Sequence, residues 1–248
     1  MIKQILILII IILIYVYFGL VGYSYLNDII SRTIMTVVII PALIFSFLII
    51  KITKKEHYFL FLAFIFFFLA FFLDFLAFLI WLIYGIFGET PDISPADYFW
   101  TASYFFFIYF LIMIIFLFRR LFVLNKNLII SFFLLYSFVY SFMIFLLKDV
   151  IFTPELVFFD YIYVIMDGII LALIIPLIII FLKGLISKIY SYFFFGILLY
   201  SIGDILYNIT FSFGIYYGGS FVDVFYSLAY LILSFGSYLF YSEMFKKT

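Results

Sequence analysis

Cysteine is absent from this 248-residue chain, and histidine occurs once, at His57. Without cysteine neither a disulfide nor a thiolate metal site can form, and one histidine cannot supply the paired ligands of a haem or of a hydrolytic metal centre. The sequence also has no nucleophile elbow, no glycine-rich phosphate loop and no basic face for nucleic acid. We therefore expect no cofactor, no nucleic-acid partner and no enzymatic activity.

Charge is scarce as well: charged residues make up 10% of the chain and hydrophobic residues 70%. The remainder cannot cover a water-soluble surface, whereas apolar runs of about 20 residues match helices that cross a hydrocarbon core of about 30 Å. We predict an all-α polytopic membrane protein with eight transmembrane helices in a lipid bilayer. The predicted helices are 4–22, 34–50, 58–86, 98–118, 128–147, 161–182, 189–213 and 222–242. The first is expected to be retained, because it has no small-residue cleavage site.

The basic residues indicate how these helices are oriented. On an eight-helix path Arg32 and Lys148 lie on one side, and all other lysines and arginines lie on the opposite side. By the positive-inside tendency, both termini are predicted to be cytoplasmic and the chain to lie in the cell membrane. Among the acids outside the helix interiors, only Glu56 and Glu243 fall on the cytoplasmic side. The outer acids are either ordinary loop solvation or a surface that attracts cations.

An eight-residue pattern occurs twice in the chain. Residues 97–104 read Asp-Tyr-Phe-Trp-Thr-Ala-Ser-Tyr, and residues 223–230 read Asp-Val-Phe-Tyr-Ser-Leu-Ala-Tyr. Each copy begins an apolar run and follows another apolar run that carries an aspartate, Asp74 in the first half and Asp204 in the second. This internal repeat predicts two parallel four-helix units. The predicted units are residues 1–126 and 127–248.

Three aspartates lie inside predicted helices, where a charged side chain costs about 2.5–3.5 kcal/mol near the bilayer centre. Asp74 and Asp204 follow the cytoplasmic ends of their helices by a rise of roughly 23 Å at about 1.5 Å per residue, and Asp167 reaches a similar depth from the other side. No lysine or arginine lies within a predicted span. Each carboxyl must therefore be protonated, hydrogen-bonded, hydrated or paired with an incoming cation.

We expect these three acids to line one cavity that is open to the outer side and binds a small ligand or cation. Asn208 lies one helical turn from Asp204 on the same face. The first and last residues of each repeated pattern are expected around the mouth of the cavity; they are Asp97, Tyr104, Asp223 and Tyr230. Two other interpretations stay open. Asp97 and Asp223 could cap helices at the membrane surface, and the three buried acids could belong to a hydrogen-bond network between helices.

The spacing of these residues is similar to that of a known class of protein. Asp74 with residues 93–97 and Tyr104, and Asp204 with residues 219–223 and Tyr230, resemble the multi-helix membrane sensor modules that precede diguanylate cyclase or histidine kinase domains in prokaryotes. The resemblance covers about half of the chain, and no such domain follows Lys247. It implies a stand-alone prokaryotic sensory or interaction module that signals through a membrane or cytoplasmic protein partner.

The alternative function is transport. In a small ion- or proton-coupled transporter, Asp74, Asp167 and Asp204 would take up and release the ion near the interface between the repeats. Prolines or glycines that break helices at the depth of the paired acids would favour transport. The prolines of the second and sixth predicted helices lie apart from the helices of Asp74 and Asp204, so the sequence favours the sensory module.

Overall fold

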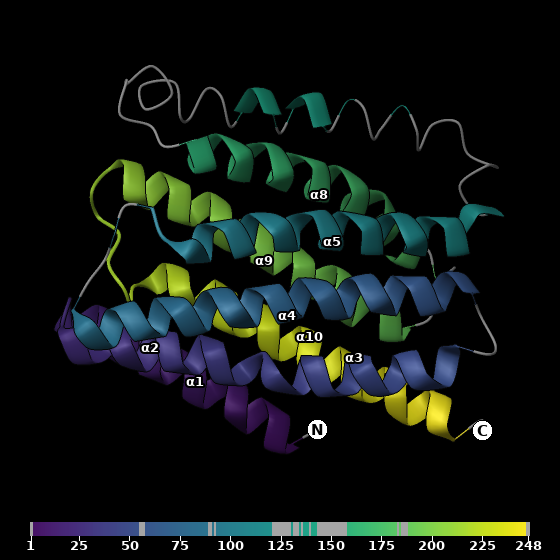
Figure 1. The fold of residues 1–248 in the computed structure, drawn as a ribbon, viewed down its shortest axis with the longest axis horizontal. Helices are drawn as coiled ribbons and strands as arrows, with labels where there is room; N and C mark the ends of the chain where they lie inside the picture. The colour runs from purple at the N-terminus through teal and green to yellow at the C-terminus, as the bar shows by residue number, and fades with distance from the viewer. Residues whose placement is uncertain are drawn as a thin grey trace.

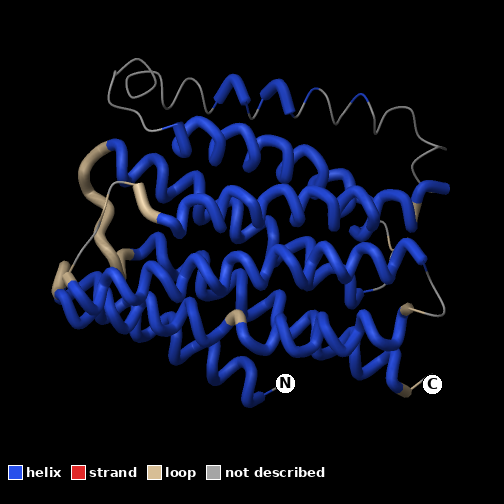
Figure 2. Tube along the Cα trace, viewed as in Figure 1, coloured by secondary structure: helices blue, strands red, loops and turns tan. Residues whose placement is uncertain are grey.

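The computed structural model is a bundle of helices that run side by side (Figure 1, Figure 2). It describes residues 2–54, 58–88, 91, 93–120, 130, 134, 136–138, 140–142, 158–182, 184 and 188–246, and no strand occurs among them. The helices are α1 (Ile2–Val21), α2 (Tyr25–Val38), α3 (Ile40–Thr53), α4 (Tyr58–Phe87), α5 (Pro95–Leu117), α8 (Phe158–Leu182), α9 (Lys188–Ser212) and α10 (Phe221–Phe245). The predicted helix 128–147 lies largely outside the described residues.

Six segments of the described chain are long and apolar enough to cross a membrane, which indicates a polytopic membrane protein. They are Tyr25–Thr53, Tyr58–Phe87, Pro95–Leu117, Ile162–Leu182, Lys188–Phe211 and Phe221–Phe245. A shorter apolar stretch, Ile9–Val21, belongs to α1. The ends of α4, α5, α8, α9 and α10 fall within three residues of the predicted bounds.

The prediction that the second helix begins at residue 34 is wrong. The helix begins at Tyr25, and the side chain of its N-cap, Ser24, accepts a hydrogen bond from the backbone N–H of Asn27 at 3.1 Å. Asp28 and Arg32, both expected in an outer loop, lie inside α2 and are buried. A basic residue therefore does lie within a candidate membrane span, contrary to the sequence-based expectation.

The segment that begins with α2 continues almost without interruption into α3. The break falls at Ile39, and Pro41 occupies the first turn of α3. A proline in that position loses no helical hydrogen bond, because the first N–H groups of a helix have no partner within it. Together α2 and α3 span the length of the bundle, as Figure 1 shows.

The helices run back and forth between two ends of the bundle (Figure 1). One end, which we call the loop end, carries the turns 22–24 and 213–220, the last turn of α4 and the first turn of α5. The other end carries the last turns of α3, α5 and α10 and the first turn of α9. Every basic side chain that the structure describes, except Arg32, is exposed and lies at or near this second end. These residues, which define the basic end, are Lys51, Lys54, Arg119, Arg120, Lys188 and Lys246.

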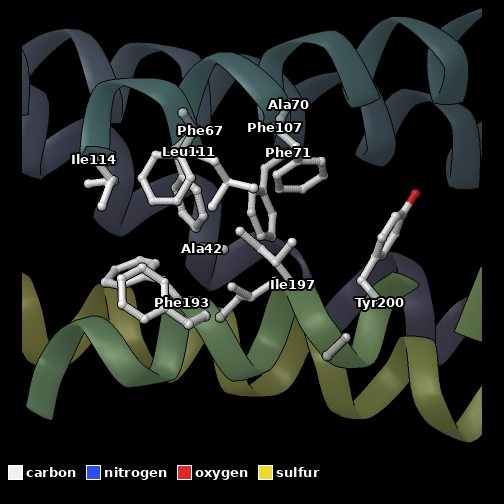
Figure 3. Packing of buried hydrophobic residues seen from close by; sticks show 14 of the residues in the cluster. Ala42, Phe67, Ala70, Phe71, Phe107, Leu111, Ile114, Phe193, Ile197 and Tyr200 are labelled. Carbon is white, nitrogen blue, oxygen red and sulfur yellow. The ribbon is translucent and has the colours of Figure 1, made fainter. Parts of the chain in front are cut away.

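Phenylalanine rings fill the interior on the basic-end side of Asp74. The ring centroids of Phe67 and Phe71 lie 4.5 Å apart, and those of Phe67 and Phe193 lie 5.2 Å apart. Figure 3 shows Phe67, Phe71 and Phe107 facing Phe193 across the interior. We call these rings the phenyl layer; its members, each at most 1% exposed, are Phe64, Phe67, Phe71, Phe107, Phe110 and Phe193. Edge-to-face and tilted contacts of this kind stabilise aromatic packing beyond the area it buries.

Two glycines allow α9 and α10 to approach each other closely. A Cβ atom on Gly196 would lie 2.4 Å from Leu233 Cγ, and one on Gly236 would lie 2.7 Å from Tyr192 Cβ. Small residues at such contacts let helices pack tightly in a membrane, where the hydrophobic effect between helices is weak. The α9–α10 hairpin therefore forms a close-packed wall for the site described next.

Candidate functional site

A cavity of about 420 Å³ lies among the helices at the loop end. Turn residues Tyr23, Pro91 and Tyr217 line it, so the cavity reaches this end of the bundle. Eight tyrosines and both tryptophans of the chain, Trp81 and Trp100, contribute to its lining. A volume of this size falls within the range of small-molecule sites, which is roughly 300–1,000 Å³.

The lining of the cavity carries an excess of acidic side chains. Four aspartates, Asp28, Asp97, Asp204 and Asp223, line it together with one basic residue, Arg32. The Arg32 guanidinium is already engaged, since its Nε donates to Asp28 Oδ1 at 2.7 Å and its Nη1 donates to the Trp81 carbonyl oxygen at 2.5 Å. It also lies 4.5 Å from the centroid of a Trp81 ring. The other three carboxyl groups have no basic partner among the residues that the structure describes.

Two of the sequence-predicted tyrosines and two of the aspartates pair reciprocally between the predicted repeats. Tyr104, in the first half of the chain, donates to Asp204 Oδ2 in the second half at 2.5 Å. Tyr230, in the second half, donates to Asp74 Oδ2 in the first half at 2.9 Å. A pseudo-two-fold relation between the halves would produce such an exchange. Hydrogen bonding of this kind gives carboxyl oxygens inside the bundle the donors that water would otherwise supply.

The reciprocal pairs differ in their second hydrogen bond. Asp204 Oδ1 accepts from Tyr226 Oη at 2.6 Å, whereas Asp74 Oδ1 has no partner among the described residues. The residue of the first pattern that corresponds to Tyr226 is Trp100, whose ring packs against Phe78 with centroids 5.5 Å apart. Asp204 also lines the cavity, and Asp74 does not. One member of the pair is thus exposed to an incoming molecule, and the other is sealed in the packing.

Asp167 is buried behind Asp204 and does not line the cavity. Its side chain is 0% exposed, and neither carboxyl oxygen makes a hydrogen bond within the described part of the chain. Asp204, Tyr104 and Ser201 are its polar neighbours. Tyr163, one helical turn away, donates instead to Asp97 Oδ1 at 3.1 Å. The expectation that three acids line one cavity is therefore met only by Asp204, since Asp74 and Asp167 lie behind its wall.

The first aspartates of the two patterns have structural contacts in addition to their place in the lining. Asp97 completes a capping box, because its Oδ2 accepts from the backbone N–H of Ser94, the N-cap of α5, at 2.8 Å. Asp223 Oδ2 accepts from Ser31 Oγ at 2.7 Å and from the Gly219 backbone N–H at 2.7 Å. The helix-capping interpretation is thus correct for Asp97. Asp223, at the equivalent position of the second pattern, instead connects α10 with α2 and with the turn that precedes α10.

The turn before α10 contributes a further donor, Tyr216. Its hydroxyl donates to Asp223 Oδ1 at 3.0 Å. Burial, followed by the nearby Asp223 and Tyr207, raises the pKa of Tyr216 well above its ordinary value. The phenol therefore stays neutral across the physiological pH range and keeps its proton for this bond. Gly219, with φ of 84°, forms the turn in a conformation that side chains rarely adopt.

Of the predicted site residues, five line the cavity: Asp97, Tyr104, Asp204, Asn208 and Asp223. Tyr230 is buried and does not line it, contrary to its expected place at the mouth. The sequence did not predict the Asp28–Arg32 pair or Tyr226 as part of the site. An acid and a base four residues apart are a helical signal that could have identified the pair. Tyr226 could have been found from its place one turn before Tyr230.

The polar side chains of the cavity wall are those of four aspartates, eight tyrosines, Arg32 and Asn208. No group of three or more His, Cys, Asp or Glu side chains that could hold a metal ion occurs among the described residues. Comparison with protein-family models, with curated proteins and with solved structures found no match to this chain. The residues of the site are therefore the evidence for its function.

Proposed function

We propose that this chain is a membrane sensory or interaction module that binds a small organic cation in the cavity at its loop end. One observation carries the proposal: a cavity with mostly aromatic walls has three aspartates without a basic partner among the described residues, while the arginine in its wall is paired with Asp28. A cation that enters would meet both attractive charge and the faces of tyrosine and tryptophan rings. Aromatic faces with a nearby carboxylate are a recurrent means of recognising ammonium groups.

Asp204 is the carboxyl group that would contact the ligand. It lies in the cavity wall, and its two hydrogen bonds come from neutral tyrosine hydroxyls, so its charge is oriented but not cancelled. Trp81 and Trp100 lie in the same wall, with ring centroids 5.8 Å apart. The ligand class that fits is a small ammonium compound with apolar substituents, because inorganic cations would leave the aromatic walls unused.

The contacts of Asp204 also suggest how binding could act on the bundle. Its partners Tyr104 and Tyr226 lie on α5 and α10, and Asp204 itself lies on α9. A ligand that contacts this carboxyl would therefore change the hydrogen bonds that connect these three helices. Such a change would be passed to a protein partner, as the resemblance to prokaryotic sensor modules implies. We place the loop end outside and both termini in the cytoplasm, because the exposed basic residues gather at the opposite end.

Transport is the less favoured function. A transported ion would have to pass the phenyl layer, whose rings are closely packed and at most 1% exposed. The layer contains no polar side chain that could replace the water around an ion. A binding module needs no such path, whereas a transporter would have to repack this layer in each cycle.

Tryptophan fluorescence tests the proposal directly, because the chain has two tryptophans and both line the cavity. Purified protein would be titrated with phenyltrimethylammonium and, as the neutral molecule of the same shape, with tert-butylbenzene. We expect saturable binding of the cation alone, weakened about tenfold, or about 1.4 kcal/mol, by Asp204→Asn. Glu243→Gln is the matched control, since Glu243 is an exposed acid at the basic end.

Three results would contradict the proposal. Equal binding of the two probes would show that charge is not recognised. Unchanged affinity in Asp204→Asn would show that the cation does not bind beside Asp204 in the cavity. Accumulation of the radiolabelled cation inside sealed vesicles, driven by an imposed proton gradient, would establish transport in place of sensing.

A further inference from the structure

The Asp167 carboxyl has an environment that an ionised group cannot readily occupy. It is fully buried, and both of its oxygens lack a hydrogen-bond donor among the described residues. Leaving a buried carboxylate without a donor or a counter-charge is strongly unfavourable, because desolvation is not compensated. Asp204 differs in this respect, since its two tyrosine donors favour the charged form. The two neighbouring acids are thus suited to opposite protonation states.

The described groups that face Asp167 from the surrounding helices are neutral or acidic. Tyr104 faces it from α5, and Ser201, Asp204 and Tyr200 from α9. Ser201 Oγ also has no hydrogen-bond partner in the part of the chain that the structure describes. The groups next to Tyr104 and Tyr200 add no base among the described residues; they are Asp74 on α4, Tyr163 on α8 and Tyr226 on α10. The Tyr136 ring lies 3.8 Å from the position of a Cβ on Gly168.

We propose that Asp167 and Asp204 form a proton-binding site, in which Asp167 carries one proton and an organic cation that enters beside Asp204 releases it. The proton on Asp167 is inferred only from the burial of this carboxyl and its lack of partners. The release of the proton by a cation rests on the proposed function. The proton lies on an Asp167 carboxyl oxygen in the empty state. On binding, the ligand's positive charge replaces it beside the two carboxylates, and the proton leaves through the cavity to the solution. The net charge of the site is conserved, and no bond other than the O–H bond changes.

Proton release has a defined effect on affinity. If one proton leaves for each cation bound, lowering the pH favours the protonated, empty state, and the affinity for the cation falls tenfold for each pH unit over the range in which the proton is held. Above that range the site has already lost its proton, so affinity no longer depends on pH. Phenyltrimethylammonium is the appropriate probe, because its own charge does not change with pH.

Infrared difference spectroscopy tests the site without a ligand. Purified wild-type protein at neutral pH is expected to show the C=O band of a protonated carboxylic acid, and Asp167→Asn is expected to lose this band. Asp74→Asn is the control and is expected to keep the band assigned to Asp167. Asp74 is equally buried, but it accepts a hydrogen bond from Tyr230. A band that is absent from the wild type, or that survives Asp167→Asn unchanged, would overturn the proton site.

A proton count tests the coupling in the wild-type protein. Phenyltrimethylammonium added in weakly buffered solution with a pH-indicator dye is expected to release about one proton per bound cation, and none from Asp167→Asn, which still binds. Binding without release would refute the coupling and leave the proposed function intact. If no cation binds at all, the proposed function and the coupling both fail, while the infrared result still decides the proton site. If Asp167→Asn does not fold, the wild-type band and proton count decide.

Discussion

The replacement Asp28→Asn tests the most tightly enclosed ion pair in the described structure. The side chains of Arg32 and Asp28 are 4% and 8% exposed, and their atoms Nε and Oδ1 lie 2.7 Å apart. Asparagine has the same shape as aspartate and can still accept one hydrogen bond, so the substitution removes charge with little change in packing. What it leaves is a guanidinium inside the bundle without a counter-charge.

The magnitude follows from the geometry. Two unit charges 2.7 Å apart attract by about 6 kcal/mol at an effective dielectric constant of 20. The desolvation of both groups offsets much of this, and removing one partner of a buried pair typically costs about 3–5 kcal/mol. Arg32 keeps its bond to the Trp81 carbonyl oxygen and its contact with the Trp81 ring. We therefore expect Asp28→Asn to lower the free energy of unfolding by about 3 kcal/mol, the lower end of that range.

The assay is equilibrium unfolding in mixed micelles with increasing sodium dodecyl sulfate, followed by circular dichroism. The double variant Asp28→Asn, Arg32→Gln removes both charges and should recover most of the lost stability, since a neutral pair of similar shape needs no compensation. A loss below about 1 kcal/mol in Asp28→Asn, the value typical of a solvated surface pair, would refute the reasoning. So would a double variant that is less stable than the single one.

Three further predictions concern other parts of the molecule. Tyr104→Phe should weaken phenyltrimethylammonium binding several-fold in the fluorescence titration, whereas Tyr230→Phe, whose acceptor does not line the cavity, should leave binding unchanged; equal effects would contradict the assignment of the ligand contact. Gly236→Ala should cost about 1–3 kcal/mol in the unfolding assay through overpacking, while Gly19→Ala, with no atom within 4 Å of the added Cβ, should be neutral or stabilising. A cysteine at Asn125 should react with a membrane-impermeant maleimide only from the cytoplasm, and labelling from outside would exclude the eight-helix topology.

Much of the helical architecture could be predicted, because long apolar runs leave few alternatives in a membrane. The start of α5 followed from Ser94, Pro95 and Asp97, which act as a capping signal in the sequence and in the structure. The start of α2 did not follow, because Asp28 and Arg32 give the segment the composition of a loop. These two side chains pair only when the chain is helical. Composition alone therefore gives the segment two separate charges, whereas in the fold the two charges form one ion pair.

The site could be located but not assembled from the sequence. The positions of Asp74 and Asp204 inside apolar runs identified them, because burial of a carboxyl is costly wherever it occurs. The packing of the helices determines which hydroxyl donates to which carboxyl. No sequence pattern indicates that Tyr104 and Tyr230 each donate to an aspartate in the other half of the chain. The isolation of Asp167 was equally hidden, since the absence of a partner is a property of its surroundings in space.

The phenyl layer determines how strongly the membrane voltage acts on a molecule bound in the cavity. A layer of closely packed rings polarises weakly, whereas the cavity at the loop end is lined by carboxyl, hydroxyl and guanidinium groups. Across an energised membrane, most of the voltage therefore falls over the layer. Moving one elementary charge through the whole potential is worth about 2.3 kcal/mol per 100 mV, but an ion that stops at Asp204 crosses only a small share of it. The occupancy of the cavity would thus follow the concentration in the adjoining solution and remain almost independent of membrane voltage.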